Sequence, residues 1–564
     1  MNATATDLLT FAIYGNYYDS QLKDGGSNST SNAEVLVSWS LSVAVGGIDD
    51  DDFYTAGVVE FRPEMNSSLS SSAKLQQHLQ AYKSIITSSE AIATDIIVFP
   101  EGTLNDDQTT TYVPDPLERR DLCSDDDFAK YSEFLVQLSC AARAVRKYLV
   151  INLVEKERCL KSLACAPSGL NTYNTNVVLD RQGRVVSRYR KVHLYLEQFN
   201  RTPQPEHATF ATDFGVRFGH FICFDILFYT PAMELVRQRD VKHFIFTSKF
   251  YSELPFLTAV QLQHSWAWAN NVTLLAAGAS YPQRGTTGSG IYAGRKGTLT
   301  ALMSDGKGER RLLVARVPKT SNGHAEVPTQ KCAVFPQTGV KLMKDYQLQN
   351  YTTQLLDLKK AHEKHQQQKQ LLCNVAGFCC QFHIATQPLE TRNTLPQDTE
   401  ASQTYRLALF SGVRRYEALE WSSLKICAII ACSGDDLSSC GEVLGSHSTD
   451  FMFTTLQIEA NFSNHEKLLL MPNSLDRGLY PLTPALTTFE TSYQTARYTL
   501  RDHCSDLLTF GIYGNYFDSS STLRCGYTIH LGLHYELACF PQFFIYELDI
   551  RRTLAISFPP NKIK

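Results

Sequence analysis

Three side chains of different chemistry each follow directly after a short, mostly apolar or strand-like stretch. Glu101 comes after the run IIVFP, Lys191 after SRYR, and Cys223 after FGHFI. Cleaving an amide requires a nucleophile, a base that takes its proton and returns it to the leaving amine, and a positive group where oxyanion charge develops. A thiol, a carboxylate and an ammonium group supply these three functions. Singly, each of these signals is modest, and this chemistry requires a fold that brings the three side chains together.

The surroundings of Cys223 predict a tight turn from a strand into a helix. Thr230 is a suitable helix N-cap and Pro231 a suitable first helical residue. A thiol on such an elbow lies near helix amides, which lower its pKa and make the thiolate available. Taken singly, each residue has a plainer alternative: Glu101 in a solvated loop, Lys191 on the surface, and Cys223 as a buried thiol or half of a disulfide.

Alternating strands and helices position these residues. Apolar residues at helical spacing predict helices over 71–88 and 126–147, and a carboxylate just past a buried strand is expected at the edge of the sheet where α/β folds bind ligands. The predicted strands are 54–61, 95–99, 148–154, 176–179, 185–189, 216–223, 243–247 and 273–279. This alternation predicts an α/β layer domain of one or two sheets that ends near Val317.

The chain after Val317 has a different pattern. A polar helix rich in Gln, Lys and His is predicted over 351–372. From about Cys373 to Asp518, short strands and clustered cysteines predict a smaller β-rich domain held by disulfides. The last stretch, 525–564, shows no clear pattern.

Several blocks of the sequence, in order along the chain, resemble the vanin/biotinidase branch of the nitrilase (carbon-nitrogen hydrolase) superfamily. The runs FPE, YRK and FICFD, which contain Glu101, Lys191 and Cys223, are similar to the Glu–Lys–Cys catalytic set of that superfamily. Further blocks resemble the branch itself, at 188–191, 210–215, 223–228, 254–255, 266–269 and 287–292. The likeness covers roughly residues 53–520.

This resemblance implies an α/β fold, with a nitrilase-type αββα sandwich domain followed by a smaller β-rich, disulfide-stapled C-terminal domain. The implied divisions are a stray N-terminal segment at 1–52, a catalytic domain at 53–330, a vanin-type domain at 331–520 and an irregular tail at 521–564.

The resemblance also implies roles for individual residues. Cys223 is expected to be the nucleophile and Glu101 the base and acid. Lys191, with the backbone N–H of Phe224, is expected to stabilise the oxyanion. Glu197, six residues after Lys191, is the candidate for the second glutamate that some nitrilases use, with a surface salt bridge as its alternative. Four residues are expected near the mouth of the pocket, or else in plain core or rim positions: His220, Trp266, Tyr281 and Tyr292.

The implied reaction is hydrolysis of a small-molecule linear amide, pantetheine, to pantothenate and cysteamine through a cysteine thioester. It needs no cofactor. One alternative is biotinidase-type hydrolysis of biotin amides, which uses the same residues, and another is acyl transfer to an amine. From a different class comes a catalytically inactive secreted binding glycoprotein of the same fold, but the presence of all three reactive residues favours an enzyme.

Cysteines and glycosylation sites indicate an oxidising, secretory compartment. The chain has 15 cysteines, so one thiol would remain after pairing, and seven Asn-X-Ser/Thr sites. Asn66, Asn200, Asn350 and Asn461 are expected to be glycosylated, and Asn271, in an apolar stretch, to be buried and unmodified. We therefore expect secretion, or peripheral or lipid-anchored attachment at the extracellular face of the plasma membrane.

One further set of residues superficially suggests zinc. Its spacing fits no familiar site, and cysteines in an oxidising compartment are better explained as disulfide halves, so we expect no metal. The set is His362, His365, Cys373, Cys379 and Cys380.

The N-terminal segment contains a repeat instead of a properly placed signal peptide. Residues 6–20 match residues 505–519 at 12 of 15 positions. The apolar run 35–45 is either a signal core displaced inward or a lipid-anchor tail of something upstream. We hypothesise that residues 1 to about 46 carry the tail of an upstream tandem copy.

Charge and hydropathy do not favour two other classes of protein. The net charge is 53 − 57 = −4, which gives no support for nucleic acid as a partner. No apolar run reaches about 18 residues, which argues against a membrane-spanning helix. Hydrophobic residues make up 43% of the chain, enough for a packed core.

Overall fold

The computed structural model describes most of the chain between residues 50 and 540. The described residues are 50–124, 128–159, 165–202, 205–320, 323, 327, 339–357, 368–389, 403–416, 420–444, 451–463, 465–517, 524–529 and 535–540. The N-terminal repeat at 6–20 and the histidines His362 and His365 lie outside them. The expected domain divisions stay predictions, because the stretch around residue 330 is also largely outside the described residues.

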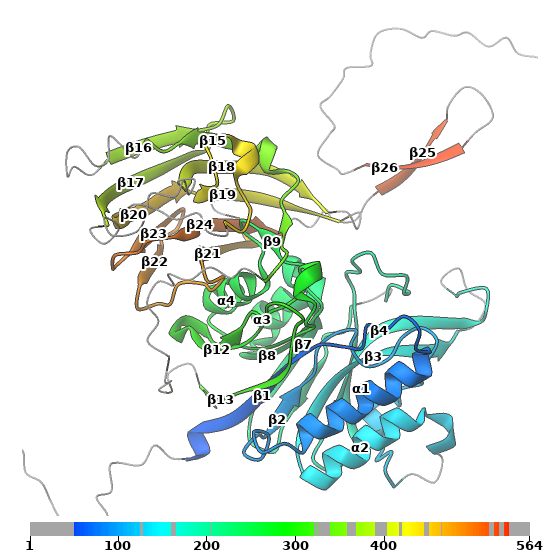
Figure 1. Ribbon diagram of the computed structural model, residues 1–564. Coiled ribbons are helices and arrows are strands. Elements are labelled where there is room, and N and C mark those ends of the chain that lie inside the picture. The colour runs from blue at the N-terminus through cyan, green and yellow to red at the C-terminus, as the bar shows by residue number, and fades with distance from the viewer. Residues whose placement is uncertain are drawn as a thin grey trace, which may run out of the picture. The chain divides into compact units, whose positions relative to one another are not determined.

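Two six-stranded mixed sheets form the first domain (Figure 1). The first has the order β13 (Arg310–Pro318), β1 (Phe53–Phe61), β2 (Ile96–Val98), β3 (Tyr148–Arg158), β4 (Leu170–Leu179) and β5 (Val185–Arg190). The second has the order β12 (Thr298–Leu302), β11 (Ser289–Ala293), β10 (Thr273–Gly278), β8 (His243–Ser248), β7 (Arg217–Ile222) and β6 (Thr209–Ala211).

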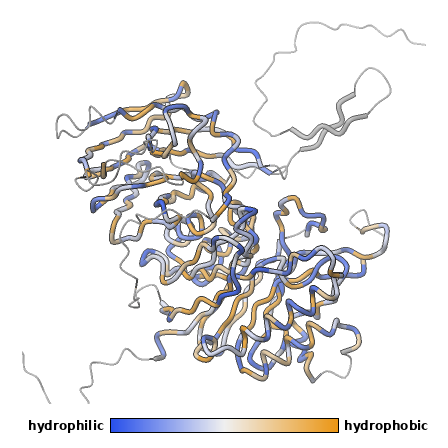
Figure 2. The backbone as a smooth tube through the Cα atoms, viewed as in Figure 1, coloured by the Kyte–Doolittle hydropathy of each residue, from blue (hydrophilic) through white to orange (hydrophobic). Residues whose placement is uncertain are grey.

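The two sheets pack face to face with helices outside, which gives the expected αββα sandwich. Side chains alternate along β1: Val58 enters the core between the sheets, whereas Val59 faces the core under the helices. Helices α1 (Ser71–Ile86) and α2 (Glu133–Val145) bury their apolar residues on the first sheet. Helices α3 (Glu234–Arg239) and α4 (Ala259–Asn270) cover the second sheet. Figure 2 shows hydrophobic residues concentrated along the central strands.

Two five-stranded antiparallel sheets form the second domain. One has the order β15 (Thr352–Leu355), β18 (Thr404–Arg415), β19 (Trp421–Cys432), β24 (Leu507–Tyr516) and β21 (Leu468–Asp476). The other has the order β16 (Gln368–Cys373), β17 (Cys379–Pro388), β20 (Phe451–Asn461), β23 (Thr495–Leu500) and β22 (Thr487–Thr491). Two small two-stranded sheets pair β9 (Glu253–Leu254) with β14 (Met343–Lys344) and β25 (Arg524–Ile529) with β26 (Tyr535–Phe540).

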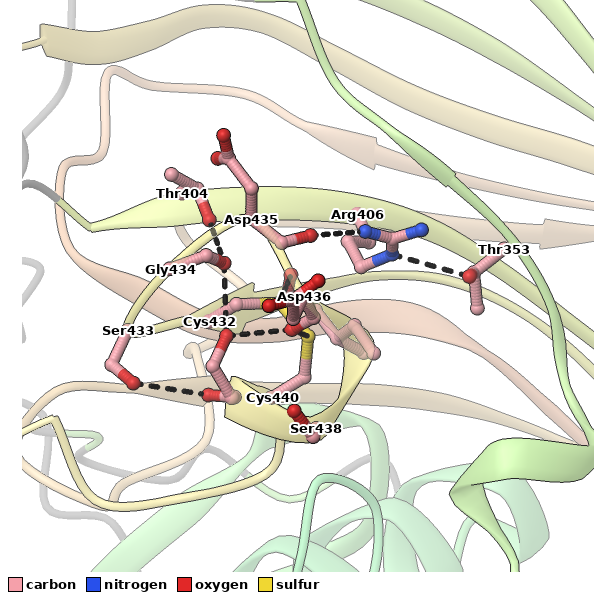
Figure 3. Close-up of a disulfide and its surroundings, with 12 residues drawn as sticks. Thr353, Thr404, Arg406, Cys432, Ser433, Gly434, Asp435, Asp436, Ser438 and Cys440 are labelled. Atoms are coloured by element: carbon pink, nitrogen blue, oxygen red, sulfur yellow. Dashed lines mark hydrogen bonds between the residues drawn. A yellow bond between two sulfur atoms is a disulfide. The ribbon is translucent and has the colours of Figure 1, made fainter.

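Five disulfides with both partners described support the expected stapled domain and the oxidising setting. They join Cys123 to Cys140, Cys159 to Cys165, Cys373 to Cys379, Cys380 to Cys427 and Cys432 to Cys440. Three of the five lie in the second domain. Figure 3 shows the Cys432–Cys440 bond closing the turn after β19, where the Thr404 hydroxyl donates to the Gly434 carbonyl at 2.6 Å.

Two predicted helices differ from the structure. The polar helix over 351–372 is wrong, because its two ends are strands β15 and β16, which pair with β18 and β17. These pairings outweigh the helix propensity of Gln and Lys. The helix over 126–147 is shorter than expected, since a single turn at Phe128–Lys130 precedes α2. The tail expected to be patternless contains β25 and β26.

Three of the four asparagines expected to be glycosylated are exposed. Asn66, Asn350 and Asn461 are exposed, whereas Asn200 is half-buried and its side-chain oxygen accepts a hydrogen bond from the Thr172 N–H at 2.8 Å. Their glycosylation stays a prediction. Among the described helices, none has the length and apolarity needed to cross a membrane.

Candidate active site

The three reactive residues predicted from the sequence lie together at the ends of three strands. Glu101 follows β2, Lys191 follows β5 and Cys223 follows β7. The Lys191 Nζ donates a hydrogen bond of 2.7 Å to Oε1 of Glu101, and the Cys223 thiol is hydrogen-bonded to the same carboxylate. Glu101, Lys191 and Cys223 are only 2%, 1% and 6% exposed. The plainer alternatives of a solvated glutamate and a surface lysine are therefore excluded, and Cys223 is a free, buried thiol and not half of a disulfide.

Glu197 belongs to the same cluster. Its Oε1 accepts a hydrogen bond of 2.5 Å from the Lys191 Nζ, and its Oε2 accepts one of 3.2 Å from the Asn174 Nδ2. The same Asn174 amide donates to Oε1 of Glu101 at 2.7 Å. A lysine and an asparagine thus bridge two glutamates, and the partner of Glu197 is a buried ammonium group rather than a surface cation.

A buried row of asparagine side chains fixes Asn174. Asn152 on β3 donates to Asn174 Oδ1 at 2.7 Å and to Asn176 Oδ1 at 3.1 Å, both on β4. The Gly102 N–H donates to Asn152 Oδ1 at 2.9 Å and so links the row to the loop of Glu101. These asparagines were missed from the sequence, although polar residues at alternate positions of a buried strand, as in Asn174 and Asn176, are a signal that could have found them.

The charged groups of the cluster shift one another's pKa values. Burial raises the pKa of Glu101, but the Lys191 ammonium and hydrogen bonds outweigh it, so that pKa lies below its ordinary value. Burial lowers the pKa of Lys191, but the two carboxylates raise it well above its ordinary value. Burial and the Glu101 charge raise the pKa of Glu197 to about 7, against the opposing effect of Lys191. At neutral pH, Glu101 and Lys191 are charged and Glu197 is close to its midpoint.

The prediction of a lowered thiol pKa is wrong. Burial, followed by the negative charge of Glu101, raises the pKa of Cys223 well above its ordinary value, even though Lys191 acts in the opposite direction. The resting thiol is therefore protonated, and its hydrogen bond to an ionised Glu101 gives the proton a direct acceptor.

The elbow at Cys223 is tighter than the sequence suggested. Cys223 has φ of +47° and begins a single helical turn, Cys223–Leu227, so the turn lies at the thiol itself rather than at Thr230. Asp225 holds this conformation: its Oδ2 accepts hydrogen bonds from the Ile222 N–H at 3.0 Å and the Tyr189 hydroxyl at 2.7 Å. Left-handed backbone at a non-glycine residue is typical of functional sites whose surroundings impose it.

A cavity of about 830 Å³ opens onto Glu101 and Cys223. Polar side chains that line it include Asn152, Asn174 and Glu197. Aromatic, apolar and charged side chains also line it, among them Asp106, Tyr195, Phe199, Lys249, Tyr251, Arg284 and Met343. Glu101 is also fixed on this side, because its Oε2 accepts a hydrogen bond of 2.7 Å from the Lys249 N–H. A cavity of this volume accommodates a small molecule in contact with Glu101 and Cys223.

The four residues expected at the mouth of the pocket do not line this cavity. Three of them are fully buried in the core: His220 contacts the Ser187 hydroxyl at 2.7 Å, Trp266 packs among aromatic rings, and Tyr292 donates to Gln263 at 2.9 Å. Tyr281 lies nearer, since the Lys249 ammonium is 5.6 Å from the centre of its ring. Large aromatic residues have the same sequence signal in a core as at a rim, which explains the error.

Comparison with known proteins places these features in a family context. The model of the carbon-nitrogen hydrolase family matches residues 55–273, and the model of the vanin C-terminal domain matches residues 340–520. The chain is 43% identical over 515 residues to vanin-like protein 1 of Drosophila melanogaster, covering 85% of this chain and 90% of that protein.

More distant relatives carry names of enzymes. The chain is 31% identical over 471 residues to biotinidase of Takifugu rubripes, covering 76% of this chain and 88% of that protein. It is 29% identical over 471 residues to pantetheinase of Bos taurus, covering 80% of this chain and 85% of that protein.

Proposed function

Because the chain belongs to the vanin/biotinidase branch of the carbon-nitrogen hydrolases, we propose that it hydrolyses pantetheine to pantothenate and cysteamine through a thioester on Cys223. The observation that carries this proposal is the contact of a free thiol, an ionised carboxylate and a buried ammonium group beside one cavity. Among the cysteines whose side chains the structure describes, Cys223 is the free one.

The first half of the reaction forms the thioester. Glu101 takes the thiol proton as the Cys223 sulfur attacks the amide carbonyl, and the carbonyl oxygen becomes an oxyanion. The Lys191 ammonium and the Phe224 N–H stabilise that charge, a type of interaction worth about 10²–10³ in turnover. When the intermediate collapses, the C–N bond breaks and Glu101 returns the proton to the departing amine, cysteamine.

The second half hydrolyses the thioester. Glu101 takes a proton from water, and the resulting hydroxide attacks the acyl carbon. Collapse of this second intermediate breaks the C–S bond, releases pantothenate, and the proton on Glu101 restores the Cys223 thiol. Because Glu101 is ionised and already hydrogen-bonded to the thiol, it suits both proton transfers.

Biotin amides are the second candidate substrate. The resemblance to biotinidase covers most of both chains, and the same three residues would cleave the amide of biotinyl-lysine. A cavity of about 830 Å³ imposes no size limit that separates the two substrates.

A direct test incubates the full-length protein with pantetheine and with biotinyl-lysine and detects pantothenate or biotin by mass spectrometry. We expect pantothenate from the wild type and none from Cys223→Ser with unchanged thermal melting. Biotin alone would favour the second candidate. Absence of both products, from protein with its disulfides formed, would favour a binding glycoprotein.

Extracellular localisation is part of the same proposal. Five disulfides between described residues support an extracellular protein, since such bonds persist in oxidising compartments. Membrane attachment, peripheral or lipid-anchored, stays a prediction that phase partitioning of the expressed protein would test.

A further inference from the structure

One side chain of the second domain contacts the turn that carries Cys223, and another contacts the segment that follows Lys191. Tyr416 follows β18 and Glu420 precedes β19, and the Tyr416 N–H donates to the Glu420 carbonyl at 2.8 Å. Tyr416 is 9% exposed and Glu420 is 7% exposed, because both are covered by the catalytic domain. These two residues at the end of a hairpin therefore belong to the surroundings of the active site.

Tyr416 packs on the aromatic residues of the catalytic turn. Its ring is 5.3 Å from the Phe224 ring at 89° and 6.2 Å from the Phe228 ring at 72°, both edge-to-face contacts. Phe224 and Phe228 contact each other at 4.9 Å. Aromatic pairs of this geometry stabilise one orientation of the rings. Phe224 directly follows Cys223, and its backbone N–H would stabilise the oxyanion. A residue of the second domain thus holds the Phe224 side chain in place.

Glu420 holds the segment that carries Lys191 and Glu197. Its Oε1 lies 2.7 Å from an Arg201 guanidinium nitrogen and 3.7 Å from the His193 Nδ1. Burial raises the pKa of Glu420, but His193 and Arg201 outweigh it and keep the group ionised. The two contacts flank the short stretch between residues 193 and 201, in which Glu197 faces the buried ammonium.

His193 passes this restraint on to the nucleophile. Its backbone N–H donates to Asp225 Oδ1 at 2.9 Å, its Nε2 lies 3.0 Å from the Thr230 carbonyl oxygen, and its ring stacks on Phe228 at 3.9 Å. Asp225 in turn fixes the left-handed backbone at Cys223. Contacts therefore run without interruption from Glu420 through His193 and Asp225 to the elbow.

A buried arginine anchors the hairpin itself. Arg414, 3% exposed, donates to Asp345 Oδ2 at 2.7 Å and to Glu253 of β9, in the catalytic domain. Its guanidinium also lies 5.3 Å from the centre of the Tyr416 ring. The end of the hairpin is thus fixed with respect to the first domain. Tyr416 and Glu420 can therefore hold the residues that they contact in defined positions.

We propose that the second domain positions the catalytic turn, with Tyr416 and Glu420 as positioning residues for Cys223 and for the segment carrying Lys191. The inference rests on the proposed function only in taking Cys223 as the nucleophile. It gives the second domain a role in turnover in addition to any role in stability.

The test compares full-length Glu420→Gln and Tyr416→Leu with the wild type. The first readout is the rate constant for alkylation of Cys223 by iodoacetamide, which needs no substrate; the second is kcat and KM for pantetheine. Since small misplacements of reacting groups cost up to about 10²-fold, we expect alkylation and kcat to fall about tenfold or more while KM changes less than about threefold.

Matched controls separate positioning from folding. Glu442→Gln removes an exposed ion pair of the same domain, 3.0 Å from Lys344, and Tyr416→Phe keeps the ring on Phe224. Both should alkylate and turn over within about twofold of the wild type. Should the buried variants misfold, Arg201→Gln weakens the Glu420 contact from its exposed side and should still slow alkylation.

The alkylation rates test the positioning role, and the cleavage of pantetheine tests the proposed substrate. Wild-type alkylation rates in folded Glu420→Gln and Tyr416→Leu, or in folded Arg201→Gln where the other two misfold, would overturn the inference. If the wild type cleaves no pantetheine but the variants still alkylate slowly, the proposed substrate fails and the positioning role stands.

Discussion

Replacing Lys191 with methionine should destabilise the protein in a pH-dependent way. The Lys191 ammonium is 2.7 Å from Glu101 and 2.5 Å from Glu197, and both carboxylates are largely removed from solvent. Removing one partner of a buried ion pair costs about 3–5 kcal/mol, because the remaining charge has no compensation. Without Lys191, burial and mutual repulsion would raise the pKa of both glutamates.

The sign of the pH dependence follows from these changes in pKa. In the wild type the pKa of Glu101 lies below 4.5, so its contribution to stability is present at neutral pH and lost in acid. In Lys191→Met both carboxyl pKa values would lie above that of the unfolded chain, so stability falls as pH rises. A pKa that differs by one between the folded and unfolded chain corresponds to about 1.4 kcal/mol of stability. The deficit relative to wild type should therefore be largest near pH 8 and shrink toward pH 5.

Urea unfolding at pH 5 and pH 8 measures this deficit. The control is Lys242→Met, which removes an exposed lysine 2.7 Å from Asp240 and should leave stability close to wild type at both pH values. A deficit that is equal at the two pH values, or larger at pH 5, would refute the assignment of charges within the cluster. Turnover by Lys191→Met should fall by about 10²–10³ in the same preparations.

Three further substitutions test other parts of the structure. Ionised Glu197 disfavours negative charge on the nucleophile, so wild-type kcat/KM should fall as pH rises through about 7, and a Glu197→Gln profile that keeps this step would contradict the assignment. Burial raises the pKa of Glu60 to about 7, although hydrogen bonds from neighbouring hydroxyls act in the opposite direction. The free energy of unfolding of the wild type should therefore fall by about 3 kcal/mol between pH 4.5 and 7. Urea unfolding should show no such loss in Glu60→Gln. A Cβ at Gly511 would lie 2.5 Å from the Ala428 Cβ, so Gly511→Ala should lower thermal stability by about 1–3 kcal/mol, whereas Gly434→Ala, with ordinary contacts, should be nearly neutral.

The cluster of Glu101, Lys191 and Cys223 was predictable where local sequence determines position. Glu101, Lys191 and Cys223 each stand at a strand end, and parallel or neighbouring strands bring such ends to one edge. The αββα sandwich and the stapled second domain were likewise expected from strand–helix alternation, cysteine clustering and family resemblance, and both are confirmed.

The remaining features depend on contacts between distant parts of the chain. The charge state of Cys223 was mispredicted because helix amides near the elbow were considered but not burial or the charge of Glu101, which is 122 residues away. Asn174 was missed because its role requires two glutamates on other segments. Residues 352–355 and 368–373 adopt strands through pairing partners that no local propensity reveals.

The place of β24 in its sheet has a consequence for biosynthesis. This strand lies between β19 and β21, yet its residues are translated after those of both neighbours, so the sheet that supports the Cys223 turn closes only once residue 516 has left the ribosome. Until then, a nascent chain would hold Cys223 next to a sheet that still lacks one of its inner strands.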